Sequence, residues 1–123
     1  MPVSYAVDAA QCTVFTSMTG AVTARDLETF VVTLGADPQF DPTFRHLFDC
    51  RHIATVDVSG DDMRRLVTNH VVQPGTRRAI VVDDPAIFGM ARMFQTLREL
   101  EDDQGVHIFR TLEDARAWLG LGA

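Results

Sequence analysis

The residues best suited to chemistry lie between Asp49 and Gly60 and at Asp83. Asp49 and Arg51 fall at the end of an expected central strand, and Asp83 ends the neighbouring strand. Open α/β sheets bind ligands outside the carboxyl ends of their strands, and an arginine there offers a fork of donors to a carboxylate or phosphate. The sequence therefore predicts a charged rim that recognises a ligand or a protein partner, made of these residues: Asp49, Arg51, Asp57, Ser59 and Asp83. For Asp49 and Arg51 themselves, an ion pair or a loop clamp is the first interpretation, and recognition of a ligand is the alternative.

Ser59 has two possible roles. The run Ser59-Gly-Asp-Asp62 is a capping box, in which the serine hydroxyl and the acid three residues later bind each other's backbone amides. A phosphate on Ser59 would also be stabilised by the helix macrodipole. Because the capping box already occupies the hydroxyl, we expect Ser59 to cap a helix rather than to accept a phosphate.

A catalytic site has weaker support. His52 could act as a base with Asp49 or Asp57 in a small hydrolase or isomerase, but no serine or cysteine has a nucleophile context such as G-x-S-x-G. Asp83 and Asp84 could bind a divalent ion, but no second ligand cluster accompanies them. The histidines share no zinc-binding spacing, and they are His46, His52, His70 and His107. We therefore expect no catalytic residues, no metal and no cofactor.

Composition excludes several other classes of protein. All 11 basic residues are arginines, so the lysine that a Walker phosphate loop, a Schiff-base enzyme or a receiver domain normally requires is missing. The net charge of −6 disfavours binding to nucleic acid. No apolar run approaches the roughly 18 residues of a membrane span, and the start of the chain has no signal-peptide pattern. We expect a single cytoplasmic domain over residues 1–123.

One apolar helix face could form a groove. Phe88, Met90, Met93 and Phe94 lie on a helix expected from Asp84 to about Glu101. Methionine adapts its shape, and surfaces of this kind bind lipids, other hydrophobic ligands or partner helices. Core packing against a sheet is the first interpretation of this face. An acyl-binding cleft against the preceding helix and a homodimer interface are the alternatives.

Periodicity and capping signals place the remaining elements. Strands are expected at residues 3–8, 12–18, 44–50, 78–83 and 106–110. One helix follows Thr23 and ends at Gly35, a second presents Met63, Leu66, Val67, His70 and Val71 on one side, and the last lies between Thr111 and Gly120. Residues 53–56 are expected to be a short apolar connection to the second helix. The alternation of strands and helices predicts an α/β fold with a mixed, mostly parallel sheet of about five strands and about four helices.

This order of elements resembles the STAS fold of anti-sigma-factor antagonists, and in particular its SpoIIAA-like branch. The supporting segments are Phe48–Arg51, Asp57–Gly60, Ala79–Asp84 and Ile108–Leu119. The branch shares its architecture with the lipid-binding CRAL-TRIO (SEC14-like) domains. In the antagonists, an aspartate and a directly following phosphorylatable residue open the second helix, and a glycine comes soon after. Asp57 and Gly60 match that pattern, but Val58 occupies the acceptor position.

The resemblance implies a non-catalytic regulatory or binding domain that acts through protein–protein interaction and not through a standard serine phospho-switch. The first alternative is a carrier of a lipid, fatty acid or other hydrophobic ligand in a cleft between the second and third helices. The second alternative is the small hydrolase or isomerase built on His52.

Overall fold

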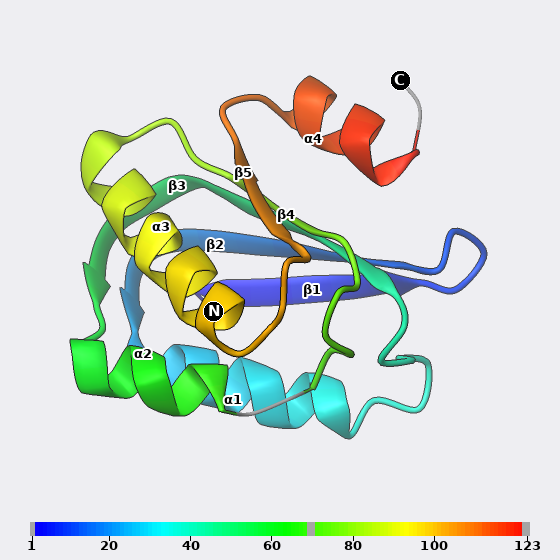
Figure 1. The fold of residues 1–123 in the computed structure, drawn as a ribbon, viewed down its shortest axis with the longest axis horizontal. Helices are drawn as coiled ribbons and strands as arrows, with labels where there is room; N and C mark the ends of the chain where they lie inside the picture. The colour runs from blue at the N-terminus through cyan, green and yellow to red at the C-terminus, as the bar shows by residue number, and fades with distance from the viewer. Residues whose placement is uncertain (1, 69–70, 122–123) are drawn as a thin grey trace.

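A five-stranded sheet runs through the centre of the protein in the computed structural model, which describes residues 2–68 and 71–121 (Figure 1). The strands lie in chain order across the sheet: β1 (Val3–Asp8), β2 (Thr13–Thr23), β3 (Arg45–Asp57), β4 (Arg78–Val81) and β5 (Val106–Phe109). β1 and β2 form an antiparallel hairpin, and all later neighbours pair in parallel. The mixed, mostly parallel sheet predicted from the sequence is therefore confirmed.

Helices cover both faces of this sheet (Figure 1). The helices are α1 (Ala24–Gly35), α2 (Gly60–Val67), α3 (Pro85–Leu100) and α4 (Leu112–Leu119). Ile80 and Val82 face the side of α1 and α3, whereas Ala79 and Val81 pack against α4. Because successive residues of a strand point to opposite faces, a strand covered on both sides is apolar at every position.

The helix ends follow the capping signals of the sequence. Thr23 and Ser59 each form a reciprocal capping box with the aspartate three residues later. The Asp84 carboxylate accepts hydrogen bonds from the first amides of α3, and Thr111 caps α4. Gly120 ends α4 at a φ of 78°, a left-handed conformation that glycine adopts without strain.

The prediction for residues 53–56 is wrong, because these residues continue β3 rather than connect it to α2. Two register shifts occur where β3 pairs with the second half of β2, and each adds one residue to β3. A bulge of this kind changes which face the following side chains meet. Cys50, Ile53 and Val56 therefore all pack on the same core, although they are spaced three positions apart in the strand.

The second helix is also shorter than the sequence suggested. α2 ends at Val67, and Val71 lies beyond it in a segment that leads to β4. His70, which the sequence placed on the apolar face of this helix, lies outside the described residues.

Candidate functional site: an apolar cavity with a polar end

A cavity of about 170 Å³ lies between the sheet and the three helices α1, α2 and α3. The sheet contributes apolar side chains from β2, β3 and β4, among them Met18, Phe48, Cys50 and Ile80. The helices contribute Leu27, Phe30 and Leu34 from α1, Met63 and Leu66 from α2, and Ile87, Met90, Ala91 and Phe94 from α3. Protein interiors normally contain few voids larger than a water molecule, so this space is an unusual feature of the core.

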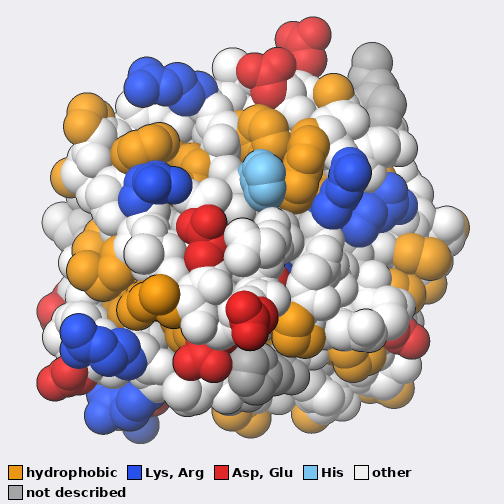
Figure 2. All heavy atoms as spheres, in the orientation of Figure 1, with side chains coloured by type: hydrophobic (Ala, Val, Ile, Leu, Met, Phe, Trp, Pro, Cys, Tyr) orange, Lys and Arg blue, Asp and Glu red, His pale blue; other side chains and the backbone are white. Residues whose placement is uncertain are grey.

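Part of the lining that α2 and α3 contribute is incompletely buried. Leu66 on α2 and Met90 and Phe94 on α3 line it but are only half-buried. Figure 2 shows hydrophobic side chains at the surface over α3. The sequence offered a cleft between the second and third helices as one alternative, and these three lining residues belong to those helices.

His46 lies at the polar end of the cavity. Its ring is 1% exposed and stacks on Phe48 with 4.2 Å between ring centroids. Nε2 lies 3.1 Å from the Thr16 hydroxyl oxygen, whereas Nδ1 has no hydrogen-bond partner among the described residues. Burial, assisted by the charge of Arg78, lowers the pKa of His46 to about 3. The imidazole is therefore neutral at physiological pH.

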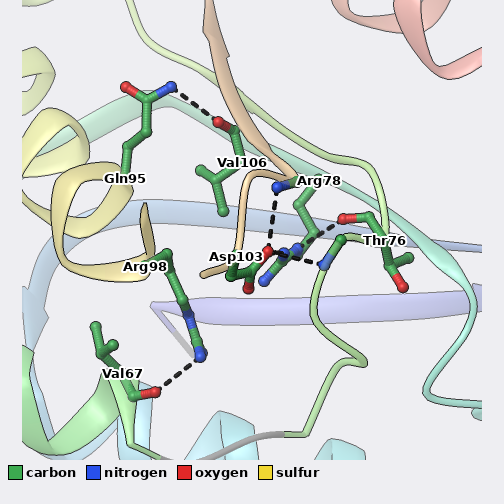
Figure 3. Close-up of polar contacts among 9 residues, drawn as sticks. Val67, Thr76, Arg78, Gln95, Arg98, Asp103 and Val106 are labelled. Atoms are coloured by element: carbon green, nitrogen blue, oxygen red, sulfur yellow. Dashed lines mark hydrogen bonds and ion pairs between the residues drawn. The ribbon is translucent and has the colours of Figure 1, made fainter. Parts of the chain in front are cut away.

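A buried ion pair between Arg78 and Asp103 closes the same end (Figure 3). The Asp103 Oδ1 atom accepts hydrogen bonds from the Arg78 guanidinium and from the backbone amides of Gly75, at 2.9 Å, and Gly105, at 3.1 Å. Burial by itself raises the pKa of Asp103, but these hydrogen bonds outweigh it and hold the pKa below its usual value. Arg78 also donates from Nε to the Thr76 carbonyl oxygen at 2.9 Å.

Arg98 reaches the polar end from α3. Its Nη1 atom donates to the Val67 carbonyl oxygen at the end of α2, at 2.7 Å (Figure 3). The guanidinium carbon lies 5.3 Å from the centre of the Phe94 ring, within the range of a cation–π contact. Burial lowers the pKa of Arg98, yet an arginine keeps its charge in proteins. Arg98 therefore joins Arg78 and Asp103 as a buried charged residue at this end.

The residues of the charged rim that the sequence predicted do not all lie together in the structure. The Asp49 carboxylate accepts two hydrogen bonds of 2.9 Å from Arg51, and this contact lowers the pKa of Asp49. Asp83 is exposed, and its charge is among the causes that raise the pKa of Arg51. Asp57 ends β3, up to about 26 Å from Asp49 at the usual rise per strand residue, and Ser59 follows it as the cap of α2.

Ser59 caps α2 as expected. Its hydroxyl accepts a hydrogen bond from the Asp62 amide at 3.0 Å, and the Asp62 carboxylate accepts one from the Ser59 amide at 3.0 Å. Val58, which holds the acceptor position of the antagonist family, is buried.

The four residues of the predicted hydrophobic groove also lie in different surroundings. Met90 and Phe94 line the cavity, and Phe88 packs against the core of the same face. Met93 is 40% exposed and takes no part in the lining.

The remaining chemical hypotheses concern the outer surface. His52 is exposed on β3, and its charge contributes to the lowered pKa of Asp49. The hydrolase or isomerase built on His52 stays a prediction.

In the part of the chain that the structure describes, no group of three His, Cys, Asp or Glu side chains could hold a metal ion. None of the described helices is long and apolar enough to cross a membrane.

Sequence reasoning missed the polar end of the cavity. A signal existed at His46, which alternates with the inward-facing Phe48 and Cys50. Arg78 directly precedes the buried run of β4, a position where a charge requires a partner. The partner, Asp103, is 25 residues further along the chain, and no local pattern connects the two.

Comparison with solved structures identifies the fold. The chain matches the crystal structure of an uncharacterized protein from the DUF3478 family with a SpoIIAA-like fold, from Shewanella loihica PV-4, with a TM-score of 0.63. The match covers 95% of this chain and 93% of the other, at 18% sequence identity. The SpoIIAA-like fold that the sequence suggested is therefore confirmed. The sequence matches no protein-family model and no curated protein.

Proposed function

We propose that this protein is a non-catalytic binding domain that holds a small hydrophobic ligand in the cavity beneath α1, α2 and α3. The observation that carries the proposal is the apolar space of about 170 Å³ in the core. An engineered cavity of about 150 Å³ with a lining of this kind stays dry and binds benzene. The ligand's apolar part therefore has roughly the size of one aromatic ring or a short alkyl chain.

Filling the cavity should stabilise the folded protein. An empty cavity destabilises a protein by about 24 cal/mol per Å³, so a void of about 170 Å³ costs about 4 kcal/mol. A domain of this size is stable by about 5–15 kcal/mol in total. A ligand that restores the missing contacts recovers a large share of that stability.

The lining is suited to exchange of the ligand. Met90 and Phe94 are half-buried on α3, opposite Leu66 on α2. An unbranched methionine has several rotatable bonds and a polarizable sulfur, so its side chain can pack against ligands of different shapes. A small shift of these side chains opens a path between α2 and α3.

Binding of toluene tests this proposal. Titration of ¹⁵N-labelled protein should shift the amide resonances of lining residues, and toluene at 100 times its Kd should raise the free energy of unfolding by about 2.7 kcal/mol. Ala91→Phe places a ring in the cavity and should abolish both effects, because Ala91 is a buried lining residue on α3. Ala117→Phe, on the exposed surface of α4, is the matched control and should bind toluene normally.

Two results would contradict the proposal. The first is a wild-type protein whose spectrum and stability do not respond to toluene. The second is an Ala91→Phe protein that is folded and binds as well as the wild type. If Ala91→Phe does not fold, Cys50→Met fills the same space from β3 and replaces it in the comparison.

A protein partner at the charged rim remains the alternative function. Two bonds to Asp49 already occupy Arg51, which leaves the exposed Asp83 as the rim's most accessible charge. Measurement of the molar mass by light scattering at increasing concentration would reveal a homodimer.

A further inference from the structure

We infer that the ligand is a small uncharged molecule with a hydroxyl group, whose apolar body fills the cavity and whose hydroxyl binds Nδ1 of His46. This inference rests on the proposed function and specifies the class of ligand. Three observations support it: the unpartnered nitrogen of His46, the neutral state of its ring and the apolar lining around it.

His46 presents a buried nitrogen to which no group of the described residues is bonded. The side chain is 1% exposed, its ring belongs to the cavity lining, and Nδ1 has no hydrogen-bond partner there. The Oδ2 atom of Asp103 also has none, but Asp103 is not part of the lining. Buried polar atoms normally have a partner, because leaving one without costs free energy. A ligand in the cavity can provide this partner.

A hydroxyl group matches this nitrogen in either tautomer of the ring. Burial and the charge of Arg78 lower the pKa of His46 to about 3, so the neutral ring carries one proton on its two nitrogens. If the Thr16 hydroxyl donates to Nε2, Nδ1 carries the proton and needs an acceptor. If Nε2 donates to Thr16 instead, Nδ1 needs a donor. A hydroxyl group can accept or donate, whereas an ammonium group only donates and a carboxylate only accepts.

The surroundings favour a ligand without a charge. Arg78 is already paired with the carboxylate of Asp103. Arg98 donates to the Val67 carbonyl oxygen, so neither guanidinium is needed to bind the ligand. An ionised group would lose its hydration in a space lined mainly by apolar side chains, which is costly. A neutral hydroxyl loses less and recovers a hydrogen bond at His46.

The direction of the His46 ring is fixed before any ligand arrives. The ring stacks on Phe48 at 8° between planes and lies 6.1 Å from the Phe30 ring between centroids. Both aromatic rings also line the cavity. A water molecule at Nδ1 would meet these apolar rings with few polar partners, whereas a ligand packs its own apolar atoms against them. A nitrogen held in a fixed direction also reduces the entropy that binding costs.

Three probes with a phenyl body test the inference: benzyl alcohol, ethylbenzene and benzoate. In an NMR titration of the wild-type protein with ¹⁵N-labelled histidine, benzyl alcohol should shift the Nδ1 resonance of His46. Ethylbenzene has no hydrogen-bonding group and should shift this resonance much less. In calorimetric titrations, benzyl alcohol should bind more tightly than benzoate.

His46→Phe measures the contribution of the hydrogen bond. Phenylalanine keeps an aromatic ring but has no nitrogen, so the hydroxyl of bound benzyl alcohol is left without a partner. Relative to ethylbenzene, benzyl alcohol should therefore lose affinity by about tenfold or more. His52→Gln removes an exposed histidine and should leave the ratio of the two affinities unchanged. The NMR titration of the wild type requires no variant, so it decides the question even if His46→Phe does not fold.

The outcomes distinguish this inference from the proposed function. If toluene and ethylbenzene bind, but benzyl alcohol does not shift Nδ1 or loses nothing in His46→Phe, the cavity binds hydrophobic ligands and the hydroxyl preference is wrong. Tighter binding of benzoate than of benzyl alcohol would also overturn the inference, because the preferred ligand would then be charged. If toluene, ethylbenzene and benzyl alcohol all fail to bind, the proposed function itself fails.

Discussion

Acidification should destabilise this protein through His46, and the size of the loss follows from two pKa values. The imidazole is buried without a carboxylate beside it, and burial together with the charge of Arg78 lowers its pKa from 6.5 to about 3. Between these two values, the unfolded chain binds a proton that the folded protein excludes. The contribution of the neutral ring is therefore complete above about pH 6.5 and is lost as the pH falls towards 3.

The expected loss is large for a small domain. Each pH unit inside this window changes the free energy of unfolding by about 1.4 kcal/mol. Between pH 7 and pH 4.5, His46 by itself should therefore lower the free energy of unfolding by about 2.5 kcal/mol. Carboxylates such as Asp49 and Asp103, whose pKa values are held below 3.8, lose their contributions mainly below this range.

Urea unfolding at pH 7 and pH 4.5 measures the effect. His46→Phe keeps an aromatic ring against Phe48 and removes the titrating group, so its free energy of unfolding should change by about 2.5 kcal/mol less than that of the wild type over the same interval. His52→Gln removes an exposed histidine and should keep the wild-type dependence. The comparison uses only the change with pH, so a different stability of His46→Phe at pH 7 does not affect it.

Two observations would refute this reasoning. One is a His46→Phe protein with the same pH dependence as the wild type. The other is an NMR titration in which the His46 resonance of the folded protein follows a pKa near 6.5. The NMR measurement needs no variant and therefore remains decisive if His46→Phe does not fold.

Two further predictions concern the backbone at Gly105 and the helix cap at Ser59. A Cβ at Gly105 would lie 2.2 Å from the Thr76 carbonyl oxygen, so Gly105→Ala should lower the free energy of unfolding by at least about 2 kcal/mol. Gly89 on α3 has open space around it, so Gly89→Ala should raise the free energy of unfolding by about 1 kcal/mol. Equal effects of these two substitutions on urea unfolding would show that the backbone around Asp103 is not tightly packed. Ser59→Ala removes the cap of α2 and should cost about 1 kcal/mol, while Ser59→Asp keeps an acceptor at the cap and should cost much less. A Ser59→Ala protein as stable as the wild type in urea would contradict the capping role.

The parts of the fold that the sequence predicted depend on neighbouring residues. The capping boxes at Thr23 and Ser59 join residues three positions apart, and Asp84 bonds to the amides directly after it. The apolar run of β4 and the wide apolar face of α3 are equally visible in consecutive residues. These interactions form within one turn or strand, so their pattern is readable without knowledge of the fold.

The candidate site is different, because several of its main contacts join distant segments. Asp103 binds the amide of Gly75 and the guanidinium of Arg78, and His46 meets Thr16 from the neighbouring strand. The sequence groups Asp49 and Asp57 in one rim because it predicts a short connection at residues 53–56. Their separation is a consequence of the long, bulged course of β3.

Periodicity and hydrogen bonds between close neighbours were enough to indicate the order of strands and helices, their caps and the class of fold. The bulges that turn Ile53 and Val56 towards the core, and the apolar cavity between the sheet and the helices, became visible only in the folded protein. Both features depend on residues far apart in the chain, because the space between helices and the pairing of buried charges arise only when distant segments pack together.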